Sequence, residues 1–195
     1  MRRQLPFALL LVAAPAFSQG LEASLVAGYT TPGSLPRQPG GVADLRLAGS
    51  FSWGAGVDWF LTPRLGLEGS WVRQQSVLQV ATDQGRADVF DVNIDQFHGS
   101  FVFQLGGEEA RLRPFLAAGG GVALFSAPDR QAETRLSLGV GAGVRWLPTP
   151  KAGLRLQARY TPIHLDSSSQ ACDPFGFCGG WQHQLEVTGG VAVRF

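Results

Sequence analysis

Eight segments of this 195-residue chain alternate between apolar and polar side chains with a period of two. In the last of them, residues 181–195, His183, Leu185 and Val187 fall on the apolar side, which runs on to Phe195. A period of two is the signature of a β-strand whose two faces meet different environments. Helix-period stripes and helix caps are largely missing, so the sequence predicts an all-β fold.

The expected strands are separated by connections that run long, short, long, short, long, short, long. The strands are residues 21–29, 51–61, 65–71, 97–105, 112–125, 135–146, 154–161 and 181–195. Residues 31–46 are rich in proline and glycine and predict a long loop, as do residues 163–180. Weak alternation between residues 73 and 95 indicates a hairpin that continues through residues 82–85.

Aromatic residues gather near strand ends on the apolar side, at Tyr29, Phe51, Trp59, Trp71, Phe97, Trp146, Tyr160, Trp181 and Phe195. Such girdles mark the two water interfaces of transmembrane barrels, whose turns are short at one end and long at the other. The chain therefore resembles the small OmpA-type barrels of the bacterial outer membrane. The resemblance implies an eight-stranded antiparallel transmembrane β-barrel of up-and-down topology, surrounded by outer-membrane lipid. It also implies that the barrel-assembly machinery recognises Phe195 as an assembly signal. Periplasmic chaperones are the other partners implied during biogenesis.

A soluble β-sandwich or lipocalin-like barrel is the alternative interpretation, because such folds also alternate. They place the apolar face inside and the charges outside. In this chain the polar side combines arginine and glutamate with many small glycines, as a barrel interior would require. This pattern favours a barrel whose apolar face meets lipid.

The first residues have the features of a secretory signal peptide. Two arginines precede a short apolar run at residues 5–14, and small residues follow up to Ser18. The run is too short to span a membrane. We expect cleavage after Ser18, with Gly20 as the alternative, so that residues 1–18 are the signal peptide and residues 19–195 form a single barrel domain.

Ten charged residues fall on the polar side of the expected strands. They are Glu22, Asp58, Glu68, Arg113, Arg135, Arg145, Arg155, Arg159, Glu186 and Arg194. An eight-stranded barrel has an interior only wide enough for side chains. We therefore expect a packed network of ion pairs and hydrogen bonds, with a narrow pore as the alternative.

The only two cysteines, Cys172 and Cys178, lie in the last long connection. In a protein exported to an oxidising compartment, a disulfide between them is favoured over a metal site. Asp91, Asn93 and Asp95 begin like a calcium loop, but the glycine and the glutamate of that motif are missing. The sequence thus predicts no metal and no cofactor.

His98 and Ser100 resemble the His-x-Ser of outer-membrane lipid A deacylases, which are also small eight-stranded barrels. That family places an asparagine after the serine, where this chain has Phe101, and its catalytic pair faces lipid. The alternation instead turns His98 and Ser100 inward. We therefore expect a protein that is not an enzyme, an anchor whose extracellular loops bind an unidentified partner. A small solute channel and a lipid A deacylase are the alternatives, and the net charge of +1 indicates no nucleic acid.

Overall fold

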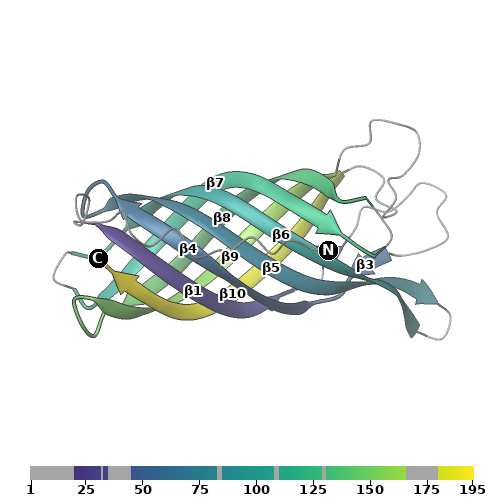
Figure 1. Cartoon of the computed structure of the whole chain (residues 1–195), viewed down its shortest axis with the longest axis horizontal. Coiled ribbons are helices and arrows are strands. Elements are labelled where there is room, and N and C mark those ends of the chain that lie inside the picture. Colours follow the sequence, from purple (N-terminus) through teal and green to yellow (C-terminus); the bar gives the residue numbers. More distant parts are fainter. Residues whose placement is uncertain are drawn as a thin grey trace, which may run out of the picture.

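A computed structural model describes residues 20–31, 33–34, 45–82, 85–107, 110–128, 131–165 and 180–195. Eight long antiparallel strands form one closed ring (Figure 1). They are β1 (Leu21–Thr30), β4 (Ser50–Phe60), β5 (Leu65–Thr82), β6 (Gly85–Gln104), β7 (Leu112–Ser126), β8 (Glu133–Trp146), β9 (Ala152–Leu165) and β10 (Gly180–Arg194). The ring closes where β1 pairs with β10, which confirms the predicted fold class.

The expected signal peptide, residues 1–18, lies outside the described residues, and so do Cys172 and Cys178. The described part of the chain contains no helix long and apolar enough to cross a membrane. The short connections after β4, β6 and β8 lie at the same end of the barrel as the end of β10 (Figure 1). Short turns face the periplasm in outer-membrane barrels, so we name the two ends periplasmic and extracellular.

The β5–β6 hairpin protrudes beyond the ring at the extracellular end (Figure 1). Its register shifts between Leu78 and Gln79, where Val89 is the extra residue of a bulge. The connection expected as a loop at residues 31–46 contributes two short strands there, β2 (Gly33–Ser34) and β3 (Leu45–Leu47). They form because the protruding part of β5 leaves backbone groups that β3 can pair with.

The two faces of the barrel differ as the alternation predicts. Outward side chains such as Leu25 and Phe101 are 65% and 64% exposed, whereas the adjacent Ser24 and Val102 are buried. An apolar outer face closed into a ring fits a lipid environment, because ring closure leaves no open sheet edge exposed to lipid.

The extracellular end of the interior contains an apolar cluster that the alternation did not predict. A buried cluster there joins Leu47, Leu78, Val92, Ile94, Ala123, Phe125 and Ile163 from five strands. Three of these residues, Leu78, Val92 and Ile94, come from the weakly alternating segment between residues 73 and 95. Polar inward side chains adjoin this cluster, since Arg135 is the cross-strand neighbour of Ala123 and Gln182 that of Ile163.

Candidate functional site

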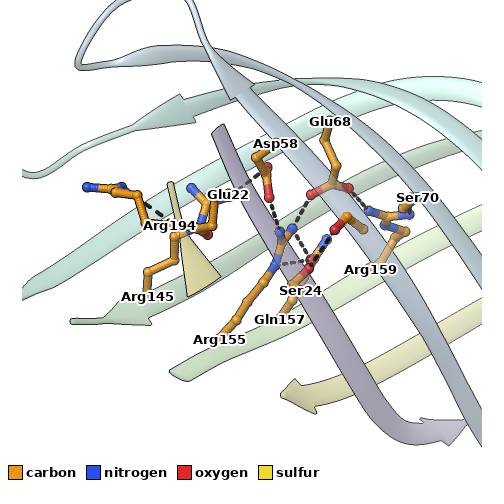
Figure 2. A network of polar contacts seen from close by, with 11 residues as sticks. Glu22, Ser24, Asp58, Glu68, Ser70, Arg145, Arg155, Gln157, Arg159 and Arg194 are labelled. Carbon is orange, nitrogen blue, oxygen red and sulfur yellow. Dashed lines mark hydrogen bonds and ion pairs between the residues drawn. The ribbon is translucent and has the colours of Figure 1, made fainter. Parts of the chain in front are cut away.

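The polar interior is built from a row of carboxylates facing a row of arginines (Figure 2). Glu22, Asp58 and Glu68 are direct cross-strand neighbours on β1, β4 and β5. Arg145 and Arg155 are cross-strand neighbours on β8 and β9. Because like charges side by side repel, each row is stabilised by reaching across the lumen to the other.

The contacts between the two rows are short and buried. Arg145 Nε lies 2.9 Å from Glu22 Oε1, and its Nη2 lies 2.7 Å from Asp58 Oδ1. Arg155 Nη1 lies 2.8 Å from the other oxygen of Asp58. Arg155 also pairs with Glu68, whose second oxygen pairs with Arg159. The network is therefore continuous from Glu22 to Arg159.

Phe115 lies inside this network and was not among the residues expected there. Its side chain is buried, and its ring centroid lies 4.5 Å from the guanidinium carbon of Arg145 and 4.8 Å from that of Arg155. Cations over an aromatic face are attracted by the ring quadrupole. The ring thus supports both arginines where they meet the carboxylates.

The remaining charged residues of the expected network lie at its margins. Arg194 Nη2 lies 3.5 Å from Glu22, and Arg113 donates from Nε to the carbonyl of Ala110 at the periplasmic end. Arg135 pairs with Glu133 on its own strand. Glu186 lines a small internal cavity together with Arg159. The ten residues are thus brought to one lumen but do not form one cluster.

His98 and Ser100 point into the lumen and are buried. His98 Nε2 lies 3.0 Å from the hydroxyl oxygen of Ser137, two strands away on β8. Gly121 of β7 pairs with both residues, and a Cβ there would meet the Phe97 carbonyl oxygen at 1.8 Å. Because Gly121 has no side chain, the imidazole of His98 can extend over β7 to Ser137. The histidine is therefore held by Ser137, with the wall of the barrel between it and lipid.

Two other histidines lie on the outer face, near the extracellular edge of the apolar band. The Tyr160 hydroxyl and Nδ1 of His183 are 2.6 Å apart across β9 and β10. Their rings are stacked, with 5.9 Å between centroids and 5° between planes. A hydrogen bond to one ring nitrogen fixes the imidazole and determines which nitrogen holds the proton.

His164 lies beside this pair, opposite Trp181 in the β9–β10 register. The two rings are 4.8 Å apart between centroids. We refer to Tyr160, His164, Trp181 and His183 as the outer-face cluster. The alternation places His183 on the apolar face, where an imidazole among leucines and valines was the available signal of a chemical role.

A charged pair marks the extracellular limit of the apolar band on the opposite wall. Arg73 Nε and Nη2 each lie 2.8 Å from an oxygen of Asp95, and Trp71 Nε1 donates to Asp95 at 3.0 Å. The hydrogen bonds from Arg73 hold the pKa of Asp95 below its ordinary value. Within the described ranges, no three His, Cys, Asp or Glu side chains group to hold a metal ion.

The chain is similar to solved outer-membrane barrels. Neisserial surface protein A matches at 18% identity and a TM-score of 0.67, over 91% of this chain and 98% of that chain. OprG from Pseudomonas aeruginosa matches at 12% identity and a TM-score of 0.64, over 91% and 97%. These likenesses show the fold. No curated protein matches the sequence.

A family model covers residues 42–164, more than half of the chain, and describes lipid A 3-O-deacylase (PagL). Our expectation that the protein is not an enzyme is therefore wrong, because the matched family is one of deacylases. The family and the solved barrels also place the protein in the bacterial outer membrane, in contact with its lipid. The chain is an eight-stranded outer-membrane β-barrel and belongs to the lipid A 3-O-deacylase family.

Proposed function

We propose that the protein hydrolyses an acyl ester of an outer-leaflet lipid, at the outer-face cluster on β9 and β10. The family match supports deacylation by ester hydrolysis as the class of reaction and lipid A as the substrate. The location follows from His183 and His164, the histidines that lie on the outer face in the described part of the chain. Histidine is the side chain most often used as a general base near neutral pH.

The depth of the cluster suits this substrate. Tyr160 and Trp181 belong to the aromatic girdle, and β9 and β10 leave the barrel just beyond them. Aromatic girdles lie at the level where lipid headgroups meet acyl chains. The ester bonds of a lipid lie at this same boundary, so the scissile bond and the imidazoles would lie at the same depth in the membrane.

The proposed reaction is an ester hydrolysis that consumes one molecule of water. With Nδ1–H of His183 donating to the Tyr160 oxygen, Nε2 holds the lone pair that takes a proton from water. The water oxygen bonds to the ester carbonyl carbon. The bond from that carbon to the sugar oxygen then breaks, and the imidazolium returns its proton to the departing oxygen. The products are a free fatty acid and a lipid with a free hydroxyl.

The interior pair is a poorer candidate for this chemistry. His98 is engaged by Ser137, and Ser100 is buried on the same inward face. A lipid ester would have to pass between hydrogen-bonded strands to reach them. The apolar cluster at the extracellular end of the lumen also favours a lipid-facing site over a function of the lumen.

Purified, folded protein in detergent with lipid A tests the proposal. In water enriched in oxygen-18, we expect released fatty acid that carries the label in its carboxyl group, and a shortened lipid A whose new hydroxyl is unlabelled. The folded state is verified by the different gel migration of unheated and boiled protein. Folded protein that releases no fatty acid, or that moves the acyl group to another lipid, would exclude the hydrolase.

A further inference from the structure

A groove on the outer face of the barrel crosses β8, β9 and β10. It holds about 780 Å³ of space open to the surroundings of the barrel and is lined in part by the outward residues Val144, Trp146, Leu154, Leu156, Gly189 and Val191. Gly189 is the lowest point of this lining, because valines lie two residues before and after it on β10. We call this hollow the outer groove.

The space above Gly189 is not filled by neighbouring side chains. Gly189 is exposed, and a Cβ at this position would meet nothing closer than Leu156 Cδ1 at 3.9 Å. Leu156 lies directly opposite on β9, and the small Ala27 lies opposite on β1. A larger side chain at position 189 would therefore fill the outer groove without forcing the strands apart.

The outer groove lies on the same wall of the barrel as the outer-face cluster, but deeper in the membrane. Gly189 follows His183 by six residues on β10, which is about 20 Å along a strand. A strand tilt of about 45° converts this length to a depth of about 14 Å. Half of the hydrocarbon core is about 12–15 Å thick. Gly189 thus lies close to the bilayer midplane, where the acyl chains of outer-leaflet lipids end.

Small side chains lie between the cluster and the outer groove. Ala158 is the next outward residue after Tyr160 on β9 toward the periplasm, and Ala142 is its cross-strand neighbour on β8. The row at the periplasmic side of the outer groove is bulky, since Trp146 pairs there with Leu154. An acyl chain that starts at the cluster would cross a low surface first and meet large side chains at its far end.

We propose that the outer groove holds the far end of the ester-linked acyl chain that is cleaved at the outer-face cluster, and that it selects lipids by the length of this chain. The inference rests on the proposed function, because a scissile ester at His183 determines where the chain begins. A saturated chain needs a surface without charged groups, which the outward side chains of the lining provide. A single methylene that an apolar pocket cannot accommodate changes kcat/KM by about 10–200-fold.

A second groove on the opposite wall provides a matched control. It holds about 730 Å³ across β4, β5 and β6, and Gly69 lies opposite Gly99 in its lining. A Cβ at either glycine would meet nothing within 4 Å. A leucine at position 69 would thus fill a hollow of similar size that a chain anchored at His183 does not reach.

Competition between two substrates tests the selection by length. Folded protein in detergent receives an equimolar mixture of two lipid A preparations that differ only in the ester-linked chain, one long enough to reach the midplane and one several methylenes shorter. The ratio of the two fatty acids released early in the reaction equals the ratio of kcat/KM. Gly189→Leu should shift this ratio toward the shorter chain by about tenfold or more. Gly189→Ala should shift it less in the same direction, and Gly69→Leu should leave it unchanged.

Photochemical cross-linking tests the position of the chain without turnover. The probe is lipid A with a diazirine at the end of its ester-linked chain, bound to the wild type and to His183→Phe protein. We expect cross-links on β8, β9 and β10 around Gly189, which Gly189→Leu removes, rather than on β5 and β6. Such cross-links in a wild type that releases no fatty acid would support the outer groove and exclude the hydrolysis. Release of fatty acid without them would exclude the outer groove alone.

The substitutions at Gly189 can also overturn the proposal. An unchanged ratio of fatty acids in folded Gly189→Leu protein would show that the outer groove does not select by length. An equal loss of both acids would have the same meaning. Conversion of a dimer to a monomer by Gly189→Leu, with the ratio unchanged, would assign the outer groove to a second copy of the chain.

Discussion

Replacing Arg155 with methionine is expected to lower the free energy of unfolding of the barrel by about 3–5 kcal/mol, the cost of removing one partner from a buried ion pair. Arg155 is buried and is the side chain that joins Asp58 to Glu68. Methionine keeps most of the volume beside Phe115 but provides no charge. Two buried carboxylates would then face each other with one arginine fewer between them.

The measurement is denaturant unfolding in detergent or vesicles, followed by the gel shift between folded and unfolded barrel. Arg64→Met is the matched control, because Arg64 lies exposed in a periplasmic turn. Combining Arg155→Met with Asp58→Asn leaves Glu22 paired with Arg145 and Glu68 paired with Arg159, and should recover much of the loss. A loss no larger than that of Arg64→Met would mean that the interior network does not stabilise the barrel.

Replacing His183 with phenylalanine is expected to reduce the rate of fatty acid release by about 10²–10⁴-fold, the usual contribution of a general base. Phenylalanine retains an aromatic ring at the girdle, so the fold and the stacking on Tyr160 are conserved. Tyr160→Phe removes only the hydroxyl that holds Nδ1. It should lower the rate less, because the imidazole would remain in place as a base but would lose the partner that orients it.

The control for this series is Ser100→Ala, which removes the serine of the His-x-Ser sequence inside the lumen. We expect it to release fatty acid at the rate of the wild type. If Ser100→Ala abolished the activity while His183→Phe left it unchanged, the reaction would have to be moved from the outer face to the interior pair.

Most of the barrel could be predicted because one face of each strand meets lipid and the other meets the lumen, and this difference produces the alternation of side chains. In β8, Leu138 and Val140 alternate with glycines, and the structure turns the two side chains outward. The extracellular extension was harder to predict. There the strands leave the bilayer, both faces meet similar surroundings, and the period weakens, so that β3 and the apolar cluster around Leu78 were missed.

The interior positions of residues such as Asp58 and Arg145 could be assigned by parity alone, but their pairing could not. Which arginine meets which carboxylate depends on the register of strands far apart in the sequence, as with Arg145 and Asp58. The outer-face cluster depends on the same kind of information. Only the β9–β10 register sets His164 opposite Trp181. It also sets Tyr160 opposite Leu185, from where its hydroxyl reaches His183 on the diagonal.

The mass spectrum of lipid A from bacterial cells that make the protein tests the central claim most directly. With wild-type protein in the outer membrane, the account predicts a new lipid A species that lacks one ester-linked acyl chain. That species should be absent with His183→Phe protein assembled to the same level, and present with Ser100→Ala. An unchanged lipid A spectrum in cells with fully assembled wild-type barrel would contradict the account.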